Sequence, residues 1–173
     1  MKLTAVLATV LVAVTLQVTL ARYTIGGRWT FDLVLVGVVY AALRWEAVAG
    51  MVAGTLGGLL QDMLSGGIVG VGGLAKTLTG FATGVIGTQF VVAKPHARAM
   101  IVAGATVMHR VTMVALQGLI DQNWSGLPWT AMLGEIAINS VCGFLAFQMT
   151  DALPGAVSRG RLSRRSSWGR RQW

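Results

Sequence analysis

The chain carries little charge for its length. Only 12% of its 173 residues are Asp, Glu, Lys or Arg, whereas 54% are hydrophobic. Soluble domains contain about a quarter charged residues. The mean hydropathy of +0.68 points the same way. This composition excludes an ordinary water-soluble domain and predicts an integral membrane protein.

Cysteine and the usual catalytic motifs are also scarce. The single cysteine, Cys142, lies in an apolar run, which excludes an internal disulfide framework and a cysteine-based zinc site. The sequence contains no HExxH, GxxxxGK[ST] or GxSxG motif and no Cys/His cluster. We therefore expect no catalytic residues, no metal site and no cofactor, and we predict that the protein is not an enzyme.

Acidic residues are few, with six Asp and Glu against 14 Lys and Arg. A basic excess can indicate nucleic-acid binding, but here six arginines fall within the last fifteen positions. Attraction to anionic lipid explains such a cluster beside a membrane helix, so we expect no nucleic-acid partner. A docking strip for a cytoplasmic protein is the alternative. The arginines are Arg159, Arg161, Arg164, Arg165, Arg170 and Arg171.

Apolar runs occupy most of the chain and predict an all-α bundle of about six transmembrane helices. The second and third runs are short for a span, which needs about 20 residues, so these two are expected to be tilted, broken or re-entrant. We predict a six-helix domain over 1–152 and a basic cytoplasmic tail over 153–173 that is disordered. The runs cover about 3–21, 31–43, 47–60, 68–92, 99–120 and 129–150.

The distribution of Lys and Arg between the predicted loops indicates the orientation. Cytoplasmic loops of membrane proteins are enriched in these residues. With both termini in the cytoplasm, ten basic residues lie inside and only Arg22 and Arg28 lie outside. We therefore predict a multi-pass protein with both termini cytoplasmic.

Glycine is concentrated in the middle of the chain, where twelve of the 23 glycines fall between Gly50 and Gly87. Several are four residues apart, which lets helix backbones approach closely. Tight helix packing and a pocket lined by backbone are both compatible with this pattern. We expect this region to face a partner helix, with the candidate residues Gly50, Gly54, Gly58, Asp62, Gly66 and Gly70.

Charged residues fall inside the predicted spans at Asp32, Lys76, Arg110 and Glu135, with His109 beside Arg110 and Asn139 one turn from Glu135. The candidate network comprises Lys76, Arg110, Glu135 and Asn139. Charged residues at membrane depth are costly and tend to face the interior of a bundle. Counted along their helices, Lys76, Arg110 and Glu135 lie at similar depth. We predict an intramembrane polar network in which Glu135 pairs with Lys76 or Arg110. Its role is either to fix helix packing or to relay protons or substrate.

The segment from Gly50 to Gly84 is the most distinctive. A glycine-bearing helix leads to Leu60-Gln61-Asp62, a Ser-Gly-Gly turn follows, and Gly70-Val71-Gly72-Gly73-Leu74 opens the next helix. This segment resembles the rod shape-determining protein MreD family. Leu16-Gln17 and Asp32 fit the same pattern. The basic tail is longer than the resemblance requires, and Phe31 stands where the family often has proline.

The resemblance implies a non-enzymatic scaffold in the bacterial inner membrane. Family members partner MreC, a periplasmic protein with a single span, and together with the actin-like MreB they help the wall-synthesis enzymes organise lateral peptidoglycan synthesis. The family fold resembles the substrate-binding component of energy-coupling-factor transporters. A vitamin-type substrate-binding component of a transporter is therefore the alternative function.

Overall fold

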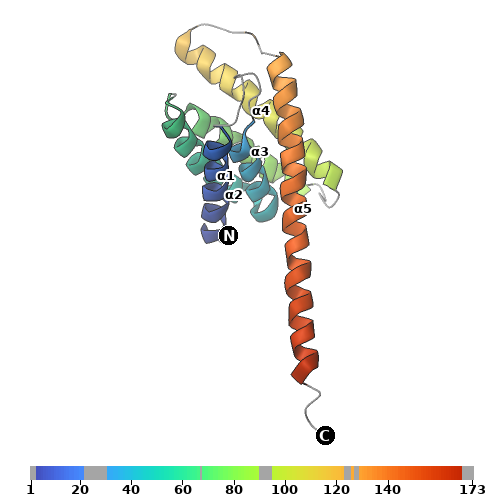
Figure 1. Ribbon diagram of the computed structural model, residues 1–173. Coiled ribbons are helices and arrows are strands. Elements are labelled where there is room, and N and C mark those ends of the chain that lie inside the picture. Colours follow the sequence, from blue (N-terminus) through green and yellow to red (C-terminus); the bar gives the residue numbers. More distant parts are fainter. Residues whose placement is uncertain are drawn as a thin grey trace.

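The computed structural model describes residues 3–21, 31–66, 68–89, 95–122, 126 and 129–168. These residues form five helices and no strand (Figure 1). The predicted all-α fold is therefore confirmed for this part of the chain. The helices are α1 (Leu3–Ala21), α2 (Leu33–Ser65), α3 (Val71–Gln89), α4 (Pro95–Asp121) and α5 (Trp129–Trp168).

Four of these helices, α1, α2, α4 and α5, are long and apolar enough to cross a membrane, as in a multi-pass membrane protein. Helix α3 does not reach this hydropathy because it contains Lys76, several threonines and five glycines. The prediction of six separate spans is therefore corrected to five helices in the described residues. The predicted second and third spans both belong to α2.

Helix α2 reverses direction at Trp45 (φ −135°, ψ 22°) and Glu46 (φ 73°, ψ −178°). A Cβ atom on Gly57 would lie 2.8 Å from Val34 Cγ1, although these residues would be roughly 35 Å apart in a straight helix. Residues 33–44 and 47–65 are thus two antiparallel arms. The first arm extends roughly 18 Å at about 1.5 Å per residue, less than the roughly 30 Å of a hydrocarbon core.

The second arm of α2 and helix α3 contact each other through their backbones. A Cβ on Gly54 would lie 2.5 Å from the carbonyl carbon of Lys76, and one on Gly58 would lie 2.5 Å from Gly73 Cα. A Cβ on Gly80 would meet Val38 of the first arm at 2.8 Å. Glycine is therefore required at these positions for both arms to pack on α3. Of the two readings of the glycine cluster, these contacts support tight packing.

Two groups of buried apolar side chains hold the remaining helices. One joins α1 to both arms of α2, and the other joins the first arm to α4 and α5. Their small and β-branched side chains let these helices approach one another closely. The first group is Val6, Val10, Val14, Val34, Val38, Ala41, Ala49 and Ala53, and the second is Val36, Val39, Val102, Ala105 and Phe147.

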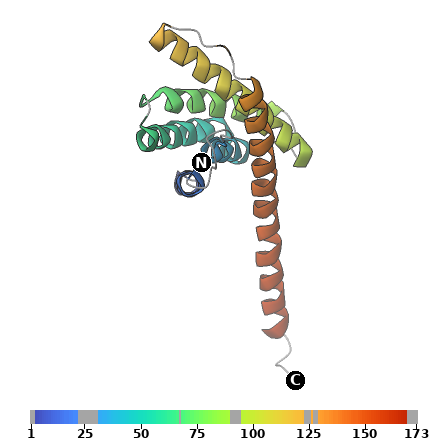
Figure 2. The same ribbon diagram turned by 45° about the horizontal axis from the view of Figure 1, so that its top comes forward.

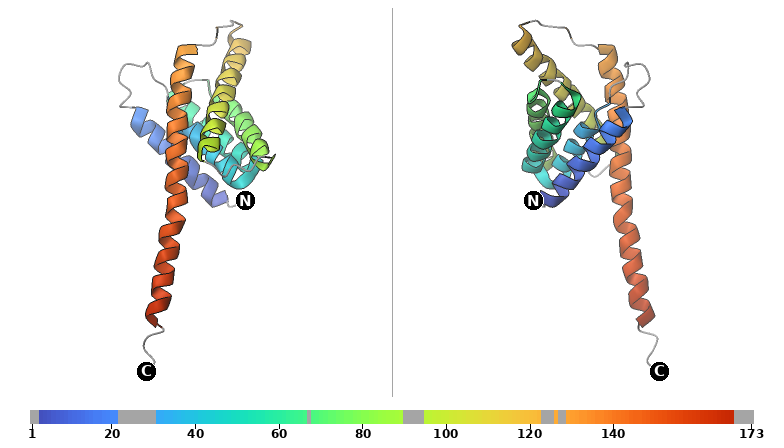
Figure 3. Two further views of the ribbon diagram at one scale, coloured as in Figure 1. Left: turned by 90° about the vertical axis from the view of Figure 1, so that its right-hand side faces the viewer. Right: turned by 60° about the vertical axis from the view of Figure 1, so that its left-hand side comes forward.

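Helix α5 continues well beyond the bundle (Figures 2 and 3). Within the predicted tail, 153–173, the backbone is helical over residues 153–168, and the disorder of the tail stays a prediction. Leucine and arginine are good helix formers, and Pro154 does not end the helix here. Near the point where α5 leaves the bundle, Arg98 Nη1 of α4 lies 2.5 Å from Asp151 Oδ2.

The end of the bundle opposite Leu3 is called the distal end below. There α1 ends, α2 begins, the chain passes from α2 to α3, and α4 is followed by α5 (Figure 1). All five helices bring polar side chains to this end, and a cavity lies among them.

Candidate functional site

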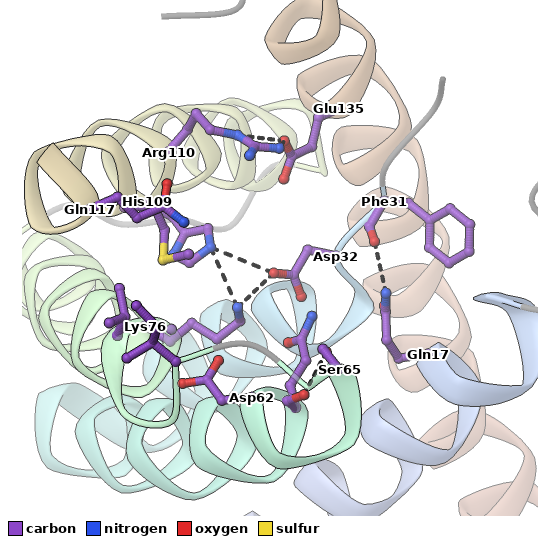
Figure 4. Close-up of a pocket in the computed structure, with 15 residues that line it drawn as sticks. Gln17, Phe31, Asp32, Asp62, Ser65, Lys76, His109, Arg110, Gln117 and Glu135 are labelled. Carbon is purple, nitrogen blue, oxygen red and sulfur yellow. Dashed lines mark hydrogen bonds and ion pairs between the residues drawn. The ribbon is translucent and has the colours of Figure 1, made fainter. Parts of the chain in front are cut away.

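A buried ion pair between Asp32 and Lys76 lies at the centre of the distal end (Figure 4). Lys76 Nζ is 2.7 Å from Asp32 Oδ2, and both side chains are almost fully buried. His109 Nε2 of α4 lies 3.4 Å from Lys76 Nζ and 3.6 Å from Asp32 Oδ2. Three helices are therefore joined through one small group of titratable side chains.

The position of Asp32 follows from its place at the start of α2. Its Oδ1 accepts a hydrogen bond of 2.9 Å from Leu35 N, which makes Asp32 the N-cap of the helix. Its own backbone N–H donates to Asn139 Oδ1 of α5 at 2.9 Å. Asn139 in turn donates to the hydroxyl of Thr106 at 3.3 Å. Asp32 is thus fixed from α5 as well as from its own helix.

Gln17 of α1 holds the residues on either side of Asp32. Its side-chain nitrogen donates to the Phe31 carbonyl at 2.9 Å, and its side-chain oxygen accepts from Leu33 N at 2.8 Å. Both ends of one amide are used, so Gln17 serves as a clamp on the backbone that enters α2. Figure 4 shows the bond to Phe31.

A second ion pair, between Arg110 and Glu135, joins α4 to α5. Arg110 Nε donates to Glu135 Oε2 at 3.0 Å, and its Nη2 contacts the same oxygen. Glu135 is buried and Arg110 is partly exposed. A buried carboxylate needs such a partner because an unpaired charge in an apolar interior is costly. This is one of the two pairings that the sequence left open for Glu135.

Asp62, near the end of α2, organises the turn into α3. Its Oδ2 accepts hydrogen bonds from Gly70 N at 2.9 Å and Gly73 N at 3.1 Å. Gly66 and Gly70 have positive φ angles of 69° and 106°, which glycine adopts without steric cost. The carboxylate therefore satisfies N–H groups at the start of α3 and fixes the conformation of the turn.

These groups surround a cavity of about 330 Å³ at the distal end (Figure 4). Small-molecule pockets start at about 300 Å³, so the cavity has room for a small ligand. Two polar atoms of residues in its wall, Gln61 Oε1 and His109 Nδ1, are buried and have no hydrogen-bond partner among the described residues. Its charged residues are Asp32, Asp62, Lys76, Arg110 and Glu135.

The predicted polar network is only partly the one that the structure contains. Lys76, Arg110 and Glu135 line the same cavity, and Asn139 lies behind Asp32. Lys76 pairs with Asp32, however, and Arg110 pairs with Glu135. Glu135 thus has one of the two partners that the sequence left open, whereas Lys76 pairs with Asp32 because the start of α2 brings a carboxylate to it.

The predicted partner-facing residues fall into two groups. Gly50, Gly54 and Gly58 are buried against α3, so this face is covered from within the chain. Gly66 and Gly70 lie in the turn, where a Cβ would meet no atom within 4 Å. Of the six tail arginines, Arg170 and Arg171 lie outside the described residues, and only the helical backbone is described for the other four.

Four further residues line the cavity but were not part of the predicted polar network: Gln17, Gln61, Asp32 and His109. Of these, Gln17, Asp32 and Gln61 are residues of the MreD-like pattern. The available signal was a lone polar side chain in or beside an apolar helix, and such residues tend to face the interior of a membrane bundle. That signal applies to each of the four, but it does not say which other helix each one meets.

Comparisons with known proteins give no identification, since no family model, no curated protein and no solved structure matches the chain. Within the described residues, no three His, Cys, Asp or Glu side chains are grouped so that they could hold a metal ion.

Proposed function

We propose that this chain is an MreD-like scaffold of the bacterial cell-elongation machinery. In this role it helps MreC and MreB organise lateral peptidoglycan synthesis at the inner membrane. The observation that carries the proposal is the bonding of Asp62 to Gly70 N and Gly73 N. These two hydrogen bonds join Asp62, at the end of one helix of the MreD-like segment, to the glycines that open the next helix.

The other residues of the resemblance lie at the same end of the bundle. Gln17 clamps the backbone around Asp32, and Asp32 pairs with Lys76, which follows the Gly70–Gly73 segment in α3. Three segments that are far apart in the sequence thus meet at the distal end. This convergence supports reading them as one family signature.

A scaffold requires rigidity, and the packing of the bundle is suited to it. The second arm of α2 contacts α3 through glycine backbones, and a buried and a partly buried ion pair join the helices. Breaking a buried pair by removing one partner costs about 3–5 kcal/mol. Relative movement of these helices is therefore opposed by several independent contacts.

The turn between α2 and α3 is the proposed contact surface for the partner. Ile68 and Val69 are 56% and 55% exposed there, while Asp62 holds the backbone of Gly70 and Gly73 through two hydrogen bonds. Apolar side chains on a rigid turn suit a protein contact, because little conformational entropy is lost on binding. MreC is the proposed partner, and MreB and the wall-synthesis enzymes act with it.

The proposed topology places both termini in the cytoplasm and the distal end on the outer side of the membrane. Counting the two arms of α2 separately, the described residues form six helical segments. Such an arrangement is compatible with the six-helix form of energy-coupling-factor substrate-binding components that the resemblance implies. The basic end of α5 is then proposed to anchor on anionic lipid.

Co-purification with MreC tests the proposed surface. Val69→Ser removes apolar area from the turn, and Val48→Ser is the matched control, because Val48 is 60% exposed at the opposite end of the bundle. The proposal expects MreC to be lost with Val69→Ser and kept with Val48→Ser. Equal recovery with both variants would remove the turn as the contact surface.

A further inference from the structure

The wall of the distal cavity contains more carboxylate and amide oxygens than the cationic and N–H groups of the protein bind. Of its three carboxylates, Asp32 pairs with Lys76 and Glu135 with Arg110. Asp62 has two backbone N–H partners but no cationic side chain within 4 Å among the described residues. The Lys76 ammonium 3.4 Å from His109 Nε2 favours the neutral form of this histidine, so the wall carries one excess negative charge. The charge balance therefore favours a cation over an anion.

The two unpartnered atoms define the hydrogen-bonding needs of a ligand. Gln61 Oε1 can only accept hydrogen bonds, and Gln61 precedes Asp62 in the chain. A ligand beside these two residues would therefore need N–H or O–H donors. His109 is only 5% exposed, and Lys76 is always a donor to its Nε2. The proton of a neutral His109 therefore sits on Nδ1, which requires an acceptor.

We propose that the distal cavity binds a small molecule or headgroup that carries a primary ammonium beside an acceptor oxygen. The ammonium interacts with Asp62 and Gln61, and the oxygen accepts from His109. An amino alcohol and the ethanolamine headgroup of a lipid both have this chemistry. The volume of about 330 Å³ corresponds to roughly ten water molecules, so it suits a headgroup or a small soluble amine.

The test compares ligands that have the same charge but differ in N–H donors. For the soluble source, calorimetry on the purified full chain compares ethanolamine with choline, which has no N–H group. For the lipid source, thermal unfolding is compared in nanodiscs of phosphatidylethanolamine and phosphatidylcholine. The proposal expects preference for ethanolamine in at least one arm, and the responsive arm identifies the source. Equal behaviour of the two ligands, or no response in either arm, would overturn it.

A variant of Gln61 distinguishes ethanolamine binding at this site from non-specific attraction of a cation to the protein. Gln61→Leu removes the Oε1 acceptor, which has no hydrogen-bond partner in the described residues, so no hydrogen bond to this oxygen is broken in the fold. Losing one hydrogen bond to a charged group should weaken ethanolamine binding about tenfold or more. Gln148→Leu, at an exposed position on α5, is the matched control and should leave binding unchanged. Unchanged affinity in Gln61→Leu would contradict the assignment, and the scaffold role does not depend on either result.

Discussion

Lys76 Nζ lies 2.7 Å from Asp32 Oδ2, and this buried pair connects the start of α2 to α3. The two residues are distant in the sequence, yet the side chains of both are more than nine-tenths buried. A charge in this position is tolerated only while its partner is present, because an isolated buried ion is poorly solvated. The burial of Lys76 in α3 therefore depends on the position of Asp32 at the N-terminus of α2.

Asp32→Asn tests this dependence. Asparagine keeps an N-cap acceptor for α2 but leaves Lys76 charged and unpaired, so the free energy of unfolding should fall by about 3–5 kcal/mol. Adding Lys76→Met should recover part of this loss. Asp151→Asn in the more exposed Arg98–Asp151 pair is the control, with an expected loss below about 1 kcal/mol. Titration with SDS in mixed micelles measures all four proteins, and equal losses in the two single Asp variants would contradict the prediction.

Gly58→Ala tests the contact between the second arm of α2 and α3. The added methyl group would lie 2.5 Å from Gly73 Cα, where backbone rather than a flexible side chain must move. Overpacking of this kind costs about 1–3 kcal/mol. Gly104→Ala is the control, since its Cβ would meet no atom within 4 Å, and alanine is the better helix former by up to about 1 kcal/mol. The unfolding titration should therefore move in opposite directions for the two variants.

Glu46 occupies a backbone conformation that favours glycine, with φ 73° and ψ −178°. Such a conformation costs a non-glycine residue about 1–3 kcal/mol. Glu46→Gly should therefore increase the free energy of unfolding, by about 1 kcal/mol or more. Val48→Gly, two residues later within the helical arm, should lower it by up to about 1 kcal/mol. A loss of stability in both variants would mean that the reversal of α2 is not formed at Glu46.

Asp62→Ala should loosen the turn into α3 without unfolding the bundle. The backbone N–H groups of Gly70 and Gly73 lose their acceptor, at a cost of about 0.5–2 kcal/mol, as for other N-terminal caps. Hydrogen exchange should become faster at these two amides and remain unchanged at Val102 in the core. Asp62→Asn, which keeps one acceptor oxygen, should show a smaller effect. Uniformly faster exchange across the chain would instead indicate global destabilisation.

Helix positions were predicted well where an apolar run is bounded by polar residues. The first run, 3–21, coincides with α1, and the last begins at Trp129 as α5 does. The break around Arg44-Trp45-Glu46 was also indicated, because charged residues interrupt the run there. Two successive spans with Arg44 on the cytoplasmic side also imply that the chain reverses there, as α2 does. Hydropathy could not show that the reversal takes only two residues. That reversal depends on two backbone conformations.

The pairing of charged residues was harder to predict than their burial. Depth along each helix placed Lys76, Arg110 and Glu135 together, and all three do line one cavity. Depth says nothing of the direction in which a side chain leaves its helix, so the choice of Asp32 for Lys76 was missed. The partner-facing role of Gly50, Gly54 and Gly58 failed for a related reason. A small-residue face predicts close packing but does not say whether the neighbour belongs to the same chain.

Depletion of the protein in growing cells is the most direct test of the proposed scaffold role. Cell width and the pattern of new wall insertion are followed by fluorescence microscopy as the protein disappears, with re-expression of the wild-type chain as the control. We expect cells to widen and round, with side-wall insertion losing its order before growth stops. Cells that keep their rod shape and ordered insertion after complete depletion would contradict the assignment to the cell-elongation machinery.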